Sequence, residues 1–92
     1  MDPLAQAVSR IIKEQQTIIG PIALDQAKKV SGLQITTADD VKVVGAGKDV
    51  LDALVNQYAK LFGRASVEVC KEAIQPLSDK LSPDQVPDIL KN

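Results

Sequence analysis

Two stretches of this sequence carry apolar residues at helical spacing, and each stretch ends at a glycine. Asp2-Pro3 indicates an N-cap and a first-turn proline at the start of the first stretch, which ends at Gly20. The second stretch ends at Gly63. Together they contain the apolar positions Leu4, Val8, Ile11, Ile12, Ile18, Ile19, Leu51, Leu54, Val55, Tyr58, Leu61 and Phe62. Because each set occupies one helical face, the pattern predicts two long amphipathic helices that share a core.

The two halves of the chain resemble each other when the sequence is displaced by about 43 residues. This displacement places Gly20 on Gly63 and Lys28 on Lys71, with apolar positions and helix ends in matching places. A displacement of about 45 matches residues 37–41 to residues 82–86. One helical unit of this kind cannot bury its apolar face alone, whereas two copies can cover each other. We therefore predict a single domain over residues 1–92, with pseudo-repeats at about 3–46 and 47–92.

The segment at residues 33–45, between the two predicted long helices, allows two interpretations. Thr37-Ala38-Asp39-Asp40 resembles a capping box and favours a short helix through residues 41–44. Alternatively, residues 33–36 and 41–44 form a small hairpin. Ser82-Pro83-Asp84-Gln85 predicts another capped short helix near the C-terminus. The preferred fold class is an all-α, compact bundle of five or six helices, in which each half has the order helix, glycine, helix and capped short helix.

The composition argues against several classes of partner. Apolar residues make up 45% of the chain, as in folded globular proteins, and Tyr58 and Phe62 are its only aromatic residues. Eleven basic and twelve acidic residues leave a net charge of −1, so neither nucleic acid nor a membrane is expected as a partner. The sequence has no signal-peptide pattern and no apolar span of roughly 18 residues. With a single cysteine, these features predict a cytoplasmic location.

The residue types that usually carry catalysis or bind metals are scarce. The chain has no histidine, which removes the commonest general base and all histidine-based metal sites. Cys70 lies on an apolar helix face, which predicts a buried residue and not a reactive thiol. Gly45-Ala46-Gly47-Lys48 lacks the spacing of a phosphate-binding loop, and the nearby aspartates lack that of a calcium loop. We expect no enzyme activity, no cofactor and no metal ion.

One segment resembles part of a known kind of module. Ile18-Ile19-Gly20-Pro21-Ile22-Ala23, followed by a helix with alanine and lysine, is similar to a segment of small helical modules attached to bacterial signalling proteins such as kinases and response regulators. The resemblance covers about twenty residues, and the second half departs from it at Gly63-Arg64-Ala65-Ser66. It implies a role in bacterial signalling or scaffolding.

Two residues whose side chains can form hydrogen bonds lie within the apolar stripes at equivalent places. Gln15 falls within the first stripe and Tyr58 within the second. A lone polar residue in an apolar seam can set the register of packed helices. We therefore expect Gln15 and Tyr58 to meet across a pseudo-twofold axis and to form a hydrogen bond.

The sequence predicts a non-catalytic protein–protein interaction or oligomerisation module. A domain of this size removes only about two-thirds of its unfolded-chain surface from water, so part of the aliphatic stripes is expected to stay exposed near the glycine breaks. The predicted protein-binding residues are Ile18, Ile19, Ile22, Leu61 and Phe62. The partner is another protein or a second copy of the chain. Two alternatives stay open: DNA binding through an imperfect helix-turn-helix over residues 23–44, and an apolar ligand held in the bundle core.

Overall fold

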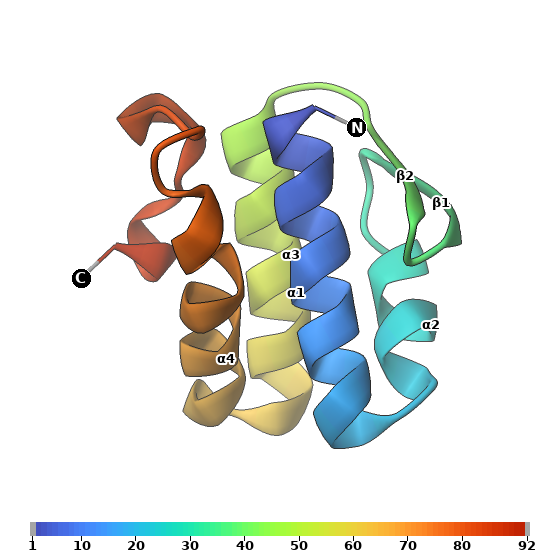
Figure 1. Cartoon of the computed structure of the whole chain (residues 1–92). Helices are drawn as coiled ribbons and strands as arrows, with labels where there is room; N and C mark the ends of the chain where they lie inside the picture. Colours follow the sequence, from blue (N-terminus) through green and yellow to red (C-terminus); the bar gives the residue numbers. More distant parts are fainter. Residues whose placement is uncertain (1, 92) are drawn as a thin grey trace.

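The computed structural model describes residues 2–91, which form four α-helices, one β-hairpin and three single turns of 3-10 helix (Figure 1). The helices are α1 (Pro3–Ile19), α2 (Ile22–Lys28), α3 (Gly47–Phe62) and α4 (Arg64–Ile74). Strands β1 (Leu33–Thr37) and β2 (Asp40–Val43) lie between α2 and α3. The 3-10 turns η1 (Gln75–Leu77), η2 (Pro83–Gln85) and η3 (Asp88–Leu90) follow α4. The helices of residues 2–91 include none that combines the length and the hydrophobicity required to span a bilayer.

The two long helices, α1 and α3, end in the same way. Gly20 follows α1 and Gly63 follows α3, with φ angles of 75° and 81° that residues with a Cβ rarely adopt. Each glycine donates its N–H to a carbonyl four residues earlier, Gly20 to Gln16 at 2.9 Å and Gly63 to Ala59 at 2.8 Å. Both turns lie at the lower end of the molecule in Figure 1. The predicted order of helix, glycine and helix is therefore present in both halves.

The core lies between α1 and α3, with α2 and α4 on either side (Figure 1). The large side chains that are fully buried on the two long helices are Val8, Ile11, Ile12, Gln15, Leu51, Leu54, Val55 and Tyr58. All of them belong to the two stripes predicted from the sequence. Because full burial of one large aliphatic side chain contributes about 1.5–3 kcal/mol, this seam holds the two halves together.

Residues 33–43 form a hairpin, so the short helix favoured by the capping-box pattern is wrong. The strands are antiparallel, and Ile35 lies opposite Val41. Covered and exposed residues alternate along β1 and β2, as expected for a hairpin with one covered face. The Thr37 hydroxyl, expected to cap a helix, accepts the N–H of Asp39 at 3.2 Å inside the hairpin turn. Threonine makes such local bonds in turns as well as in helix caps, so the pattern alone did not separate the two.

Helix α1 holds the hairpin turn in place. The Ser9 hydroxyl donates to the carbonyl of Ala38, and the Lys13 ammonium pairs with the carboxylate of Asp39. Ser9 and Lys13 are four residues apart on α1, so they share one helical face. These contacts join segments that are far apart in the sequence, and they favour the hairpin over a local helix.

The predicted bundle of five or six helices is therefore corrected, over residues 2–91, to four α-helices with a two-stranded sheet. The capped helix expected at residues 82–85 is only a single 3-10 turn. Its capping box is formed, since the Ser82 N–H donates to the Gln85 side chain at 2.9 Å. The turn stops where Val86 becomes extended before Pro87, because a residue before proline disfavours the helical conformation. The two halves thus match in their helix pairs and differ in the segments C-terminal to those pairs.

Candidate functional site

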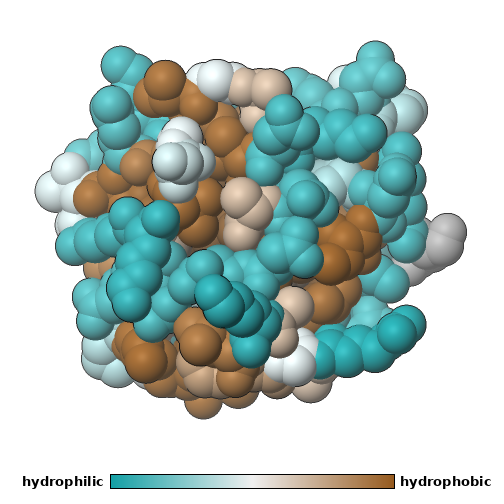
Figure 2. Space-filling model, turned by 180° about the vertical axis from the view of Figure 1, so that it is seen from behind, coloured by the Kyte–Doolittle hydropathy of each residue, from teal (hydrophilic) through white to brown (hydrophobic). Residues whose placement is uncertain are grey.

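Large hydrophobic side chains are exposed at the end of the molecule where α1 and α3 stop. Their exposed fractions are 61% for Ile18, 48% for Leu61, 42% for Ile22 and 37% for Phe62. We call these four residues, together with the half-buried Ile19, the apolar end. Figure 2 shows hydrophobic surface along the lower edge of the molecule, with further hydrophobic areas higher on the same face. The structure therefore brings all five predicted protein-binding residues to one end.

The apolar end combines matching positions from the two halves. The displacement of 43 residues pairs Ile18 with Leu61 and Ile19 with Phe62, and all four lie in the last turns of α1 and α3. Ile19 and Phe62 differ in their surroundings, because Ile19 packs against the core while Phe62 is more exposed. The apolar end thus presents to solvent the aliphatic side chains of Ile18, Ile22 and Leu61 and the ring of Phe62.

Gln15 and Tyr58 are both almost completely buried, but each binds main chain on the other half. The Tyr58 hydroxyl donates to the carbonyl of Ala23 at 2.6 Å. The Gln15 amide donates to the carbonyl of Ser66 at 3.1 Å. The direct hydrogen bond expected between Gln15 and Tyr58 is therefore replaced by two bonds to the backbone.

These two backbone bonds are equivalent to each other. The displacement that carries Gln15 onto Tyr58 also carries Ala23 onto Ser66. The long helix of each half thus donates to the same position on the short helix of the other half. Because a buried polar group without a partner costs about 1–3 kcal/mol, this exchange sets the register between the halves. It supports a pseudo-twofold arrangement, while duplication of the sequence stays a prediction.

Cys70 is fully buried beside Gln15. The Gln15 amide nitrogen lies 3.5 Å from the Cys70 sulfur. Burial raises the pKa of the Cys70 thiol to about 11, and the hydrogen bond from Gln15 offsets only part of that rise. The equivalent residue in the first half is Ala27, which is also fully buried. Cys70 therefore has the surroundings of a small core residue.

We expect the protein to lose stability between about pH 9 and pH 11. The raised pKa means that the folded chain holds the Cys70 proton more tightly than the unfolded chain does, so this stabilisation is complete below the unfolded pKa. It disappears as the pH rises through the folded pKa, at about 1.4 kcal/mol for each pKa unit. Burial also raises the pKa of Tyr58, which adds to the loss at the upper end of this range.

Urea denaturation at pH 8 and pH 10 measures this effect. Cys70→Ala, which installs the residue present at position 27, should show a smaller difference between the two pH values than the wild-type chain. An unchanged difference would show that the thiol is not the titrating group.

Residues 23–44 of the structure lack the second helix that DNA binding through a helix-turn-helix requires. The segment expected to form the recognition helix, within residues 33–44, is the β1–β2 hairpin. Such proteins read DNA with a helix in the major groove, so the structure removes this basis for DNA binding. Among residues 2–91, histidine, cysteine, aspartate and glutamate side chains form no group of three or more that could hold a metal ion.

Two surface features lay outside the residues predicted from the sequence. Val44, next to the hairpin, is 46% exposed. Hollows of about 310 and 490 Å³ lie beside α4, at the surface and not inside the bundle core where an apolar ligand was expected. Their apolar lining includes residues of the C-terminal segment, where the capping-box pattern predicted a short helix but nothing in the sequence indicated a hollow.

No protein family model matches this chain, and comparisons with curated proteins and with solved structures give no match either. The resemblance of residues 18–23 to bacterial signalling modules stays a prediction. The function is therefore argued from the geometry of the apolar end.

Proposed function

We propose that this chain is a non-catalytic protein–protein interaction module that binds its partner through the apolar end. One observation carries the proposal: of the five large hydrophobic residues most exposed in the described chain, four lie at this end. Val44 is the fifth, and it lies beside the hairpin. Single exposed hydrophobic residues are ordinary, whereas a group of them marks a surface that another molecule covers.

A second copy of the chain is the first partner to test. A twofold interface uses the same patch on both subunits, and an apolar patch complements itself without opposite charges. The residues of this end also include Ile18 and Ile19, which belong to the segment that resembles bacterial signalling modules. A scaffolding role in signalling would therefore use the same surface.

Light-scattering mass over a hundredfold range of concentration tests the proposal. We expect the average mass to rise from one chain towards two. Leu61→Lys should raise the dissociation constant about thirtyfold, because loss of a central interface side chain costs about 2 kcal/mol or more. The new lysine lies near the C-terminus of α3, where a positive charge suits the helix dipole and leaves the fold intact.

Val44→Lys is the matched control, since Val44 and Leu61 are 46% and 48% exposed. Equal weakening by both substitutions would show that the apolar end is not the interface. A mass of one chain at every concentration would exclude a second copy and direct the search to a different protein. The proposal is wrong if, in addition, the wild-type chain captures no protein from its source organism, or if the Leu61→Lys variant captures every protein that the wild-type chain captures.

A further inference from the structure

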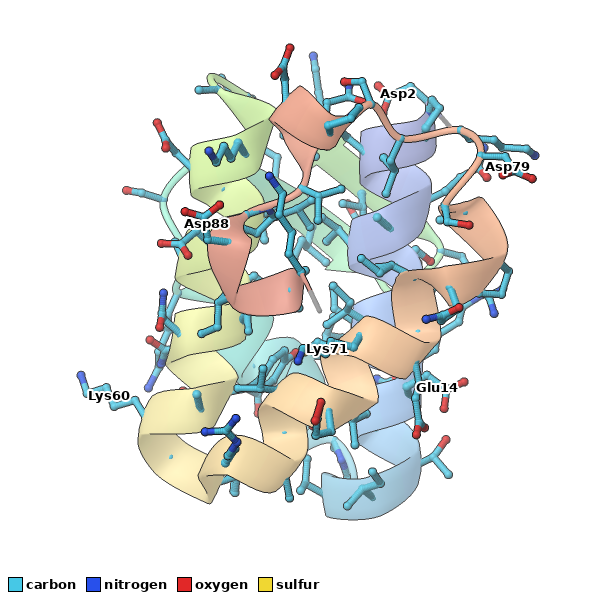
Figure 3. The ribbon with its side chains drawn as sticks, turned by 90° about the vertical axis from the view of Figure 1, so that its left-hand side faces the viewer. Asp2, Glu14, Lys60, Lys71, Asp79 and Asp88 are labelled. Atoms are coloured by element: carbon cyan, nitrogen blue, oxygen red, sulfur yellow. The ribbon has the colours of Figure 1, made fainter. Side chains whose placement is uncertain are left out.

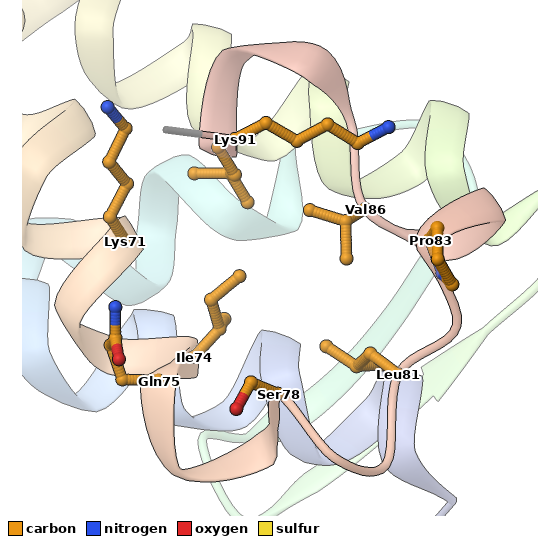
Figure 4. A pocket seen from close by; sticks show the side chains of 9 residues that line it. Lys71, Ile74, Gln75, Ser78, Leu81, Pro83, Val86 and Lys91 are labelled. Carbon is orange, nitrogen blue, oxygen red and sulfur yellow. The ribbon is translucent and has the colours of Figure 1, made fainter.

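The C-terminal segment and α4 line an open hollow at the surface. Residues 75–91 lie beside α4, and the hollow between them measures about 310 Å³. Its aliphatic lining consists of Ile74, Leu81, Val86 and Leu90. Figure 4 shows Ile74, Leu81 and Val86 directed into one space from three different parts of the chain. The volume lies at the lower end of the range of about 300–1,000 Å³ that is usual for pockets that bind small molecules.

Two lysines stand at the rim of this hollow. Lys71 on α4 and Lys91 near the end of the chain line it, and both also line the neighbouring hollow of about 490 Å³. Figure 3 shows Lys71 in the space between α4 and the C-terminal segment, whereas Lys60 extends away from the protein. Only 21% of the Lys71 side chain is exposed. The two lysines therefore flank the hollow, and Figure 4 shows their ammonium groups directed away from each other.

The carboxylates that already pair with these lysines hold them weakly. Lys71 lies 3.4 Å from Glu68, and Lys91 lies 3.6 Å from Asp88. Each pair is three residues apart in sequence, and both carboxylates are more than half exposed. Water screens such exposed pairs, so they contribute little to stability. Either lysine can therefore accept another anion at small cost.

The lining of the hollows differs in charge from the chain as a whole. Arg64, Lys71 and Lys91 line the hollows together with one carboxylate, Glu68, and a second carboxylate, Asp88, pairs with Lys91, so these groups sum to +1 while the whole chain carries a net charge of −1. An aliphatic floor with a cationic rim complements a molecule that has an aliphatic body and an anionic head.

We propose that the hollow beside α4 binds short aliphatic carboxylates. The hydrocarbon chain lies on the four aliphatic side chains, and the carboxylate pairs with Lys71 or Lys91 at the rim. None of the residues of the apolar end lines either hollow, so this site and the proposed protein-binding surface share no residue.

Titration of the full chain with octanoate, with binding measured by calorimetry and by changes in amide chemical shifts, tests the proposal. We expect octanoate to bind at least about tenfold more tightly than octanol or octylammonium, because only octanoate has an anionic head. Decanoate should bind more tightly still, by up to about fourfold for each added methylene that is buried. The largest chemical-shift changes should fall in residues 71–91, and the amides of the apolar end should change little.

The double variant Lys71→Gln/Lys91→Gln should weaken octanoate binding about tenfold and leave octanol binding unchanged. Lys42→Gln/Lys60→Gln loses the same charge from exposed lysines outside the hollows and should change octanoate affinity less than about twofold. All four lysines lie on the surface or at a rim, so both variants should unfold at temperatures close to that of the wild-type chain.

Four results would overturn the proposal. The first is no octanoate binding at millimolar concentration. The second is equal affinity for the carboxylate, the alcohol and the ammonium compound. The third is equal weakening by the two double variants. The fourth is co-sedimentation of the chain with phosphatidylglycerol vesicles without binding of free octanoate, which would make a bilayer surface the ligand.

Discussion

Replacing Leu54 by alanine is expected to lower the free energy of unfolding by about 3 kcal/mol. Leu54 is fully buried in the core on α3. The substitution removes the hydrophobic contribution of the lost atoms and leaves a cavity that the packed helices fill only in part, which together cost about 2–5 kcal/mol. A small domain is stable by about 5–15 kcal/mol, so this single change removes a large share of the total. Urea denaturation followed by circular dichroism measures the loss.

Leu61→Ala is the matched control for Leu54→Ala. Leu61 lies seven residues further along α3, and it is 48% exposed where Leu54 is fully buried. Because half of its surface already meets water, we expect a loss of about 1 kcal/mol or less. Equal losses at the two positions would contradict the division of α3 into a core face and an apolar end.

Replacing Gly32 by alanine is expected to lower the free energy of unfolding by about 3 kcal/mol. Gly32 has a φ angle of 91°, which disfavours any residue with a Cβ. An added Cβ would also lie 2.7 Å from the Val50 side chain and 2.8 Å from the carbonyl oxygen of Val44. The Gly32 carbonyl accepts the Val44 N–H at 2.7 Å, so relief of this clash would disturb the closure of the hairpin.

Gly45→Ala separates the two contributions to this loss. Gly45 has a φ angle of 96°, but nothing lies within 4 Å of an added Cβ. We therefore expect only the conformational cost, about 1–2 kcal/mol, in the same urea experiment. If Gly32→Ala destabilises the chain no more than Gly45→Ala does, the close approach of Gly32 to Val44 and Val50 is not a constraint on the fold.

The residues of the apolar end could be predicted from the sequence, but their exposure could not. Ile18, Leu61 and Phe62 could be placed on it because they continue the apolar stripes up to the glycines that end the helices. The degree of exposure could not be predicted, since it depends on how α1 and α3 pack against their neighbours. Ile19 shows this, because it belongs to the same stripe but packs partly against the core.

Gln15 and Tyr58 show a similar limit on what could be predicted from the sequence. Gln15 and Tyr58 lie inside apolar stripes of the sequence, and the structure buries both side chains. Their hydrogen-bond partners could not be predicted, because main-chain carbonyls are present at every residue and carry no sequence signal. Packing of the halves selected Ser66 and Ala23.

Local sequence was enough to specify the two long amphipathic helices, the glycines that end them and the aliphatic character of the core. Helical period, caps and glycine ends act over a few neighbouring residues, so they can be predicted without a fold. Tertiary packing was needed to establish that residues 33–43 form a hairpin, that the halves exchange polar bonds, and that a hollow lies beside α4. The bonds of Ser9, Tyr58 and Gln15 to backbone carbonyls span 29, 35 and 51 residues of sequence. Their partners come together only when the helices pack, and packing is a property of the whole chain.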